Sequence, residues 1–349
     1  MRIGTFDTDR AVLVVAEIGN NHEGDVERAR ALVRAAADCG AHAVKFQTFR
    51  ARAFVAPGDR ERLQRMTRFE LPPAAFADLR RLASSLGLLF VSTPLDLESV
   101  ATLEPLVDAY KIASGDNDFY PLIDAVCDTH RPLLVSTGLS DLDQVSATVQ
   151  HIRRRWSAAG QAGGPIGHAP PLALLHCVSA YPAPPEEANL ESIAVLRSGF
   201  GVTIGYSDHT LGIDTCVLAV AAGARIVEKH FTLDHAASDF RDHRLSADPG
   251  EMTRLVREVA RVSAVMGTRT KAVRDSERVG VAQFRRSIAA AHDLAAGHVI
   301  APEDLTWFRP ADGLRPGQEH RLIGRPLRRD VAAGTRLQES DCEPVKESR

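Results

Sequence analysis

The run VLVVAEIGNNH at residues 12–22 indicates the fold, because an apolar strand-like stretch passes directly into a cluster of polar, reactive residues. Segments with the helical spacing of apolar residues follow it, and alternating strands and helices predict parallel βα units. Eight such units predict a (β/α)8 TIM barrel with its reactive groups at the carboxyl ends of the strands. The other seven runs are AVKFQT (43–48), LLFVSTP (88–94), AYKIASGD (109–116), PLLVSTG (132–138), LALLHCVSAY (172–181), VTIGYSDH (202–209) and RIVEKHF (225–231).

Helix-start signals lie where this scheme needs them. Asp25 and Asp96 stand where N-cap residues accept backbone N–H groups, and the prolines at 72 and 73 suit the first turn of another helix. The segment 50–70 departs from the pattern and is predicted to be a long loop. Its arginines favour a solvated, charged loop over a binding site for a phosphorylated ligand: Arg50, Arg52, Arg60, Arg62, Arg65 and Arg68. The Gly/Pro-rich residues 157–171 predict a second surface loop.

The bulk composition is that of a soluble globular protein. The 349 residues include 42 Lys and Arg against 45 Asp and Glu, a net charge of −3, so nothing global favours binding to nucleic acid or to an anionic membrane. No apolar run approaches the ~18 residues of a membrane span, and the N-terminus lacks the apolar core of a signal peptide. Five widely spaced cysteines do not suggest a disulfide framework, and we expect a cytoplasmic protein.

The character of the sequence changes after residue 267. Because such a barrel needs ~250 residues, we assign residues 1–267 to the barrel, 268–284 to a polar linker and 285–349 to a small β-rich domain. Two similar phrases, DLAAGHVIAPEDL (293–305) and DVAAGTRLQESDC (330–342), form a weak internal repeat there, each with an Ala-Gly turn. A domain of ~60 residues is marginal alone, so we expect it to dock on something larger.

Two lysines lie in strands that should face the barrel interior. Strand alternation places Lys45 and Gln47 on one face of the second strand, and Lys111 recurs in the fourth. A buried ammonium group is costly unless an anion meets it, so the two lysines suggest an anionic ligand between them. Pairing of each lysine with a buried carboxylate is the alternative. Hydroxyl groups at neighbouring strand ends would complete a phosphate cradle: Thr93, Ser114, Ser136, Ser179 and Ser207.

Two histidines end the seventh and eighth strands. Adjacent strands are ~4.8 Å apart, so His209 and His230 could reach one divalent ion that keeps open positions for substrate; satisfied structural histidines are the alternative. Glu17 ends the first strand and could act as a general base or hold a water, or it could be neutralised by a lysine. Cys177 carries no nucleophile signature and is expected to be buried and inert.

In order and spacing, these residues resemble the N-acetylneuraminate (sialic acid) synthase family. The motifs that carry the resemblance include AEIGNNHEGD (16–25), KFQTF (45–49), YKIASGDNDFYPLI (110–123), LLHCVSAYP (174–182), IGYSDHT (204–210) and EKHFTLD (228–234). The C-terminal RRSI, WFRPADG and IGRPL motifs resemble the SAF domain of that family, an antifreeze-like β-clip fold. The resemblance covers about residues 10–343 and is specific in the combination of motifs.

The resemblance implies a reaction, a metal and a set of residues. Members of the family condense phosphoenolpyruvate with water and an N-acyl hexosamine such as N-acetylmannosamine. The products are a nonulosonic acid and phosphate. The reaction cleaves the C–O bond of phosphoenolpyruvate and requires Mn²⁺ or Mg²⁺. Its members are homodimers in which one SAF domain completes the neighbour's active site. The implied residues are Glu17, Lys45, Gln47 and Asp116 for catalysis; Lys45, Thr93, Lys111, Ser114, Ser136, Ser179 and Ser207 for phosphoenolpyruvate; Tyr181, Asp242 and Arg309 for the sugar; and His209 and His230 for the metal.

Departures from the family pattern lie at the sugar end. The segment after the second strand is short and Arg-rich, Arg241 precedes Asp242 where many members have Pro, and Asp116 stands where some have Glu. The resemblance therefore indicates the reaction type rather than the sugar, and a legionaminic- or pseudaminic-type synthase remains an alternative. Two further alternatives are open. One is another barrel enzyme that uses phosphoenolpyruvate or pyruvate, such as a Schiff-base aldolase, and the other is a carbohydrate-binding protein without enzymatic activity.

Overall fold

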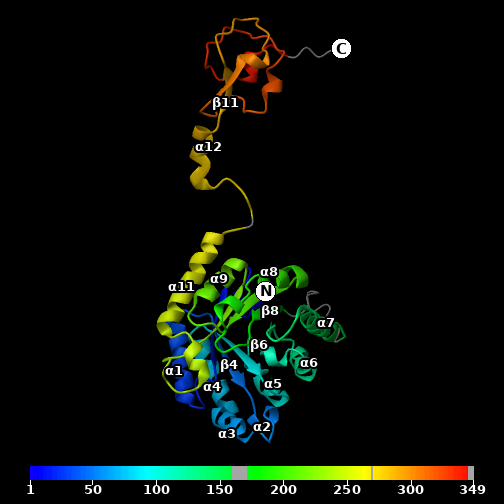
Figure 1. Cartoon of the computed structure of the whole chain (residues 1–349), viewed down its shortest axis with the longest axis vertical. Coiled ribbons are helices and arrows are strands. Elements are labelled where there is room, and N and C mark those ends of the chain that lie inside the picture. Colours follow the sequence, from blue (N-terminus) through cyan, green and yellow to red (C-terminus); the bar gives the residue numbers. More distant parts are fainter. Residues whose placement is uncertain (159–170, 269, 345–349) are drawn as a thin grey trace. The chain divides into compact units, whose positions relative to one another are not determined.

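The chain divides into two compact units, Met1–Gly267 and Thr268–Arg349. The computed structural model, drawn in Figure 1, describes residues 1–158, 171–268 and 270–344. The loop predicted at 157–171 lies outside the described residues except at its two ends. Among the residues that are described, no helix combines the length and the apolar character needed to cross a bilayer.

The first unit is a closed barrel of eight parallel strands, which confirms the predicted fold. Going round the barrel, the strands follow chain order and the last one closes on the first. Each strand pairs in parallel with both of its neighbours. The strands are β3 (Leu13–Gly19), β4 (Ala43–Thr48), β5 (Leu89–Pro94), β6 (Ala109–Ile112), β7 (Leu133–Ser136), β8 (Leu172–Cys177), β9 (Thr203–Asp208) and β10 (Ile226–His230).

Helices surround this barrel, and a short hairpin of β1 (Arg2–Ile3) and β2 (Phe6–Asp7) precedes it. Asp25 and Asp96 cap their helices as predicted, because each side chain accepts hydrogen bonds from backbone N–H groups of the first turn. The helices of the unit are α1 (Val26–Asp38), α2 (Ala51–Phe54), α3 (Arg60–Phe69), α4 (Pro73–Ser85), α5 (Leu97–Leu103), α6 (Tyr120–Asp128), α7 (Leu142–Ala158), α8 (Ser192–Phe200), α9 (Asp214–Ala222), α10 (Arg241–Leu245) and α11 (Pro249–Met266).

The prediction of a long loop between residues 50 and 70 is wrong, since α2 and α3 occupy most of it. Asp59 caps α3 by accepting a hydrogen bond from the Arg62 backbone N–H. Leu63, Met66 and Phe69 recur at a spacing of three residues and pack in a small apolar cluster with Phe49. The many arginines obscured this apolar stripe in the sequence.

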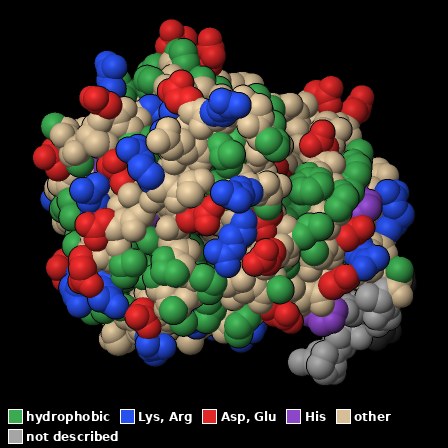
Figure 2. All heavy atoms as spheres, turned by 90° about the horizontal axis from the view of Figure 1, so that it is seen from below, with side chains coloured by type: hydrophobic (Ala, Val, Ile, Leu, Met, Phe, Trp, Pro, Cys, Tyr) green, Lys and Arg blue, Asp and Glu red, His purple; other side chains and the backbone are tan. Residues whose placement is uncertain are grey.

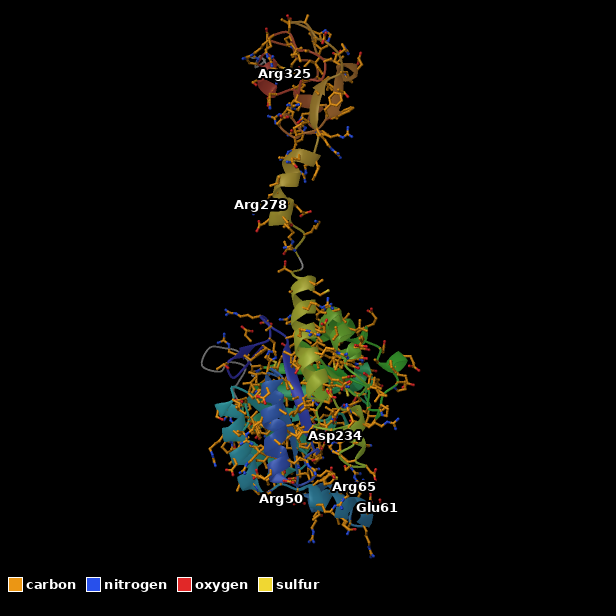
Figure 3. All side chains as sticks on the ribbon, turned by 90° about the vertical axis from the view of Figure 1, so that its left-hand side faces the viewer. Arg50, Glu61, Arg65, Asp234, Arg278 and Arg325 are labelled. Atoms are coloured by element: carbon orange, nitrogen blue, oxygen red, sulfur yellow. The ribbon has the colours of Figure 1, made fainter. Side chains whose placement is uncertain are left out.

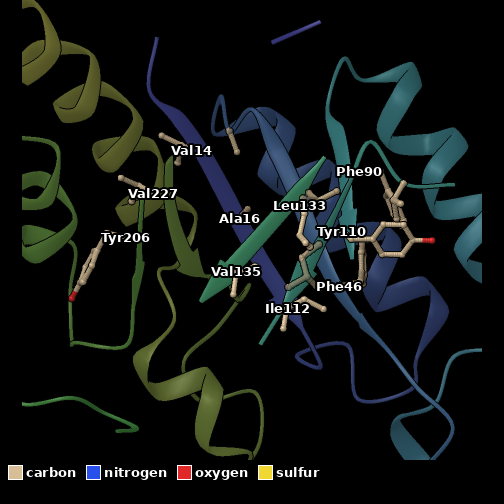
Figure 4. Close-up of a cluster of buried hydrophobic side chains, with 14 of the residues drawn as sticks. Val14, Ala16, Phe46, Phe90, Tyr110, Ile112, Leu133, Val135, Tyr206 and Val227 are labelled. Atoms are coloured by element: carbon tan, nitrogen blue, oxygen red, sulfur yellow. The ribbon is translucent and has the colours of Figure 1, made fainter. Parts of the chain in front are cut away.

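Strand alternation divides the barrel side chains into an outer and an inner set. Val14, Ala16, Phe46 and Phe90 belong to the outer set, which packs beneath the helices (Figure 4). Leu13, Val15, Ala43 and Val91 belong to the inner apolar set, which also includes Ile3 of the hairpin. Apolar side chains therefore fill the amino-terminal part of the interior, and the polar inward positions lie nearer the carboxyl ends of the strands.

The second unit contains α12 (Arg278–Phe284), strands β11 (Ser287–Ala290) and β12 (Leu305–Phe308), which pair antiparallel, and its own apolar cluster. The two repeated phrases contact each other through a bridge between Leu294 and Val331. The Asp293 side chain accepts a hydrogen bond from the backbone N–H of Ala333 at 2.7 Å. The equivalent residue of the other phrase, Asp330, accepts one from the backbone N–H of Ala296, also at 2.7 Å. The two phrases of the weak sequence repeat therefore pair with each other through matching contacts.

Candidate active site

Four buried ionisable side chains meet inside the barrel near the carboxyl ends of the strands. Lys45 Nζ lies 2.8 Å from Glu17 Oε1 and 3.6 Å from Glu228 Oε1, and Lys111 Nζ lies 4.0 Å from the same Glu228 oxygen. All four residues are at most 5% exposed. The two lysines therefore lie close to the same carboxylate, Glu228. They also form ion pairs with buried carboxylates, which was the alternative to an anionic ligand between them.

Burial acts differently on the members of this cluster. It raises the pKa of Glu17 to about 7, with a further contribution from Glu228 and against the effect of Lys45. Burial and the charge of Lys45 lower the pKa of Lys111, although Glu228 opposes this. Burial also lowers the pKa of Lys45, but the carboxylates of Glu17 and Glu228 outweigh it and the net shift is upward. The Glu17 carboxyl can therefore gain or lose a proton near neutral pH.

Hydroxyl groups surround the four charges. Lys45 Nζ donates to Thr93 Oγ1 at 3.3 Å, and Ser207 Oγ donates to Glu228 Oε1 at 2.9 Å. A Cβ atom on Gly138 would lie 2.4 Å from Ser179 Oγ and 2.7 Å from Ser114 Oγ, so only glycine lets the backbone approach both hydroxyls. The hydroxyls of Ser136 and Ser179 are buried and have no hydrogen-bond partner among the described residues.

His209 and His230 have the properties of metal ligands. Their ring centroids are 5.5 Å apart. His209 Nδ1 donates to the Val178 carbonyl at 2.7 Å, which leaves Nε2 with a free lone pair, a common arrangement for a metal-binding histidine. His230 Nδ1 is buried without a partner in the described part of the chain, and burial lowers its pKa far below the usual range, so the ring is neutral. Burial lowers the pKa of His209, but the contacts with Cys177 and the Val178 carbonyl outweigh it and the net shift is upward. The two rings offer nitrogen ligands of the kind that a divalent ion binds.

Cys177 is buried, as expected, but it lies in this site and contacts one of the two histidines. Its Sγ is 3.7 Å from His209 Nδ1. Burial raises the pKa of the thiol, but the hydrogen bond and charge of His209, together with Ser114 and Lys111, outweigh it and the net shift is downward. Strand alternation explains the position, because Cys177 ends β8 on the face that carries Ala173 and Leu175 of the inner set.

A cavity of about 810 Å³ lies at the barrel mouth, and His230 is part of its lining. The centroids of the Tyr181 and His209 rings are 4.0 Å apart, and the guanidinium group of Arg241 lies over the Tyr181 ring, 4.5 Å from its centroid. Gln47 accepts a hydrogen bond from Asn20 Nδ2 at 2.6 Å. Burial raises the pKa of Asp242, against the effect of Arg241. These side chains, together with His230, give the cavity both donors and acceptors.

Two predicted residues lie apart from this cluster. Asp116 follows β6 in a single 3-10 turn and lines a neighbouring cavity of about 670 Å³ with Phe54 and Arg62. Burial raises its pKa, with a contribution from Asp118. Arg309 belongs to the second unit, where it is exposed directly after β12.

Sequence reasoning missed Glu228 and Asn20. Glu228 stands two residues before His230 in β10, so the strand alternation applied to Lys45 and Gln47 would have placed it inside the barrel. The buried Asn20 Oδ1 has no partner among the described residues, and the side chain lines the mouth cavity. Asn20 lies in a turn after β3, where the sequence offers no periodicity from which to infer its direction.

A buried ion pair lies beside the two histidines on the outer face of the barrel. Lys229 Nζ is 2.7 Å from Asp208 Oδ2, and both side chains are 0% exposed. Asp208 also accepts hydrogen bonds from Tyr206 and Thr210. Asp208 directly precedes His209, and Lys229 directly precedes His230. The ion pair therefore joins the ends of β9 and β10 next to the two histidines.

A second group of potential metal ligands lies elsewhere. His235, Asp248 and Glu251 bring three ligand atoms within 4.8 Å of one another at the start of α11. The two carboxylates already form the capping box of that helix. This group therefore has a structural role of its own and is distinct from the histidine pair.

Comparison with known proteins extends over most of the chain. The NeuB family profile matches residues 32–271 and the SAF domain profile matches residues 285–343. The N,N′-diacetyllegionaminic acid synthase of Legionella pneumophila is 37% identical over 93% of this chain and 92% of its own length. The N-acetylneuraminate-9-phosphate synthase of Homo sapiens is 31% identical over 90% and 88%. The crystal structure of an N-acetylneuraminic acid synthetase from Leptospira borgpetersenii, in complex with citrate, has a TM-score of 0.73 at 30% identity and covers 80% of this chain and 94% of that one.

Proposed function

Because this chain belongs to the NeuB family, we propose that it condenses phosphoenolpyruvate with an N-acyl amino sugar and water, forming a sialic-type nonulosonic acid and phosphate. The observation that carries the proposal is a set of buried polar atoms without partners among the described residues. Buried polar groups are almost always hydrogen-bonded, so such a set suits a polar ligand. The atoms are Glu17 Oε2, Ser136 Oγ, Ser179 Oγ, Glu228 Oε2 and His230 Nδ1.

The phosphoenolpyruvate end would use Lys45, Lys111 and the hydroxyls around them. Both ammonium groups lie near one Glu228 oxygen, so a single small anion could contact both. Cations held in such positions stabilise the negative charge that develops on phosphate as the bond between C2 and the phosphate oxygen breaks.

The reaction can be written with these groups. The C3 carbon of phosphoenolpyruvate attacks the aldehyde carbon, and the aldehyde oxygen gains a proton. A water then adds to the electron-poor C2, with ionised Glu17 accepting the proton of that water. The C2–O bond to phosphate breaks, phosphate leaves with the bonding electrons, and the C2 hydroxyl gives its proton to the departing phosphate, so that C2 becomes the ketone carbon of the product. The proton that Glu17 takes from the water balances the one that the aldehyde oxygen gains. A divalent ion, Mn²⁺ or Mg²⁺, held by His209 and His230, would polarise the aldehyde as a Lewis acid.

The sugar end would use the mouth cavity. Gln47, Asn20, Tyr181 and Asp242 line it and can bind hydroxyl and N-acyl groups. The relatives include synthases of legionaminic and pseudaminic acids as well as of N-acetylneuraminate 9-phosphate, so several amino sugars are candidates. We further propose a homodimer in which Arg309 of one SAF domain reaches the sugar bound in the other subunit.

The test is release of phosphate from phosphoenolpyruvate in the presence of a panel of N-acyl hexosamines. We expect release to require one of the sugars, to stop in excess EDTA and to return with Mn²⁺. Full activity in EDTA would reject the metal role. No release with any sugar and any divalent ion would reject the synthase and favour a binding protein.

A Schiff-base aldolase is the second candidate, because burial and Lys45 lower the pKa of Lys111, the property that such a lysine needs. Borohydride reduction in the presence of pyruvate and sugar would trap a covalent adduct on Lys111, detected as a mass increase. We expect no adduct, and one at Lys111 would replace the proposed mechanism.

A further inference from the structure

Both histidines lie at the mouth of the barrel, but the strand ladder includes only one of them. His230 is the last residue of β10, whereas His209 follows the last residue of β9. Figure 3 shows Asp234, in the loop after β10, towards the same end of the barrel as Arg50, which lies just beyond β4. Because His209 lies outside the ladder, its position depends on other contacts.

A hydrogen-bonded turn at the end of β9 holds His209 in place. Asp208 Oδ1 accepts hydrogen bonds from the backbone N–H of Thr210 at 3.0 Å and from its Oγ1 at 2.9 Å. A bond from an Asp side chain to the backbone two residues further on closes a turn around the residue between them. Asp208 lies on the outer face of the barrel, and His209 points the other way, towards Cys177.

Lys229 ties both ends of this turn to the neighbouring strand. Its Nζ donates to Asp208 Oδ2 at 2.7 Å and to the Thr210 carbonyl at 2.5 Å. In the parallel ladder of β9 and β10, Lys229 is the direct partner of Asp208. Because His230 follows Lys229 in the chain, this one side chain links the turn around the first histidine to the strand that carries the second. Asp208, Thr210 and Lys229 thus form a clamp.

The clamp is hidden from solvent, unlike most charges of this protein. Figure 2 shows basic and acidic side chains exposed across one face of the molecule. The side chains of Asp208 and Lys229 are both 0% exposed. Tyr206 donates its phenolic proton to Asp208 Oδ1 at 3.0 Å, and Cys216 Sγ of α9 lies 3.4 Å from Oδ2. Water therefore neither screens this ion pair nor competes for its hydrogen bonds.

Stability alone does not explain such a pair. Taking two charges out of water is costly, and apolar side chains of similar volume often stabilise a fold as well or better. The neighbours on the outer face are of that apolar kind, since Ala16, the ladder partner of Lys229 on β3, and Val227 both belong to the outer set. Hydrogen bonds add direction, because each one fixes a distance and an angle. The clamp therefore indicates that the residues it flanks need a defined geometry.

We propose that Lys229 is a positioning residue for the divalent ion: through the turn around His209, it sets the separation of the two imidazole rings. The inference rests on the part of the proposed function in which His209 and His230 hold Mn²⁺ or Mg²⁺. Groups that orient a metal ligand typically contribute about 10- to 100-fold to metal affinity. Lys229 Nζ lies on the outer face of the barrel, so it acts through the turn and not as a ligand.

The test is the affinity of the full-length protein for Mn²⁺, measured by electron paramagnetic resonance of the free ion. We expect the dissociation constant to rise about 10-fold or more in Lys229→Met and in Asp208→Asn/Lys229→Met. Val227→Ala, at another fully buried outer position of β10, is the matched control and should bind as the wild type does. His230→Ala identifies the binding that belongs to the histidine pair, and circular dichroism verifies that each variant is folded.

The double variant separates positioning from stability. It leaves no uncompensated buried charge, so it should be more stable than Lys229→Met, whereas its affinity for Mn²⁺ should stay low. At saturating Mn²⁺, its phosphate release should return close to the wild-type rate, because the histidines and the lysine cradle are unchanged.

Two results would overturn the positioning role. The first is wild-type affinity in the double variant, or an affinity that follows stability through all variants including Val227→Ala; the synthase proposal would then stand. The second is a wild type that binds Mn²⁺ no better than His230→Ala does, which would remove the metal role together with the clamp. Phosphate release by the wild type then decides separately whether the chain is a synthase.

Discussion

At the scale of single residues, burial changes the acid–base equilibrium of the Glu17 carboxyl group. Burial raises its pKa from 4.5 to about 7. Between pH 4.5 and about 7, Glu17 therefore keeps its proton in the folded chain but has lost it in the unfolded chain. As the pH rises through this range, Glu17 lowers the free energy of unfolding. The carboxylate needed to accept a proton from water forms only near and above neutral pH.

The pH dependence of turnover follows from this. We expect kcat/KM to rise with pH through an acidic limb with an apparent pKa near 7, which the Glu17 carboxyl causes. In Glu17→Gln, the rate should fall roughly 100-fold or more and the acidic limb should disappear, because the amide cannot accept the proton. A steady-state pH profile of both proteins is the measurement, and a limb that persists unchanged in the variant would assign it to another group.

At the scale of the elements, His230 ends β10, His209 directly follows β9, and an ion pair on the outer face of the barrel joins these two strands. Asp208 and Lys229 are fully buried, and their charges neutralise each other at 2.7 Å. Removing one partner leaves an uncompensated buried charge, whereas removing both does not.

We therefore expect Lys229→Met to lower the free energy of unfolding by about 3–5 kcal/mol. The double variant Asp208→Asn/Lys229→Met should lose less than the single variant. Denaturant unfolding of four proteins, followed by circular dichroism, gives the comparison: the wild type, Lys229→Met, Asp208→Asn and the double variant. A double variant as unstable as the sum of the two single variants would show that the charges do not interact.

At the scale of the whole molecule, the proposed sharing of active sites between subunits makes a distinct prediction. Glu17 lies in the first unit and Arg309 in the second. If the SAF domain acts on the partner's barrel, a mixed dimer of Glu17→Ala and Arg309→Ala chains contains one site with neither substitution.

Mixing the two inactive variants under conditions of subunit exchange should then restore about a quarter of wild-type activity, since half of the dimers are mixed and half of their sites are intact. Each variant incubated alone is the control. No recovery, with exchange verified by differently tagged chains, would place the whole site within one subunit.

Much of the fold could be predicted because the barrel is built from a repeated local pattern. Apolar runs that end in polar clusters, such as residues 43–48, were interpreted correctly as strands, and Asp25 and Asp96 were interpreted correctly as helix caps. Helix α3 was missed because its three apolar contacts lie among arginines, and its stability depends on packing against Phe49 and Phe240.

The sequence by itself determined which side chains stand at the carboxyl ends of eight strands, since strand period and hydrophobicity are local properties. Only the tertiary structure decided which of them meet. It brought Glu228 between Lys45 and Lys111, placed Cys177 beside His209 and turned the arginines of α3 towards the mouth cavity. These contacts join segments far apart in the chain, and they depend on the closure and register of the whole barrel, which no local pattern encodes.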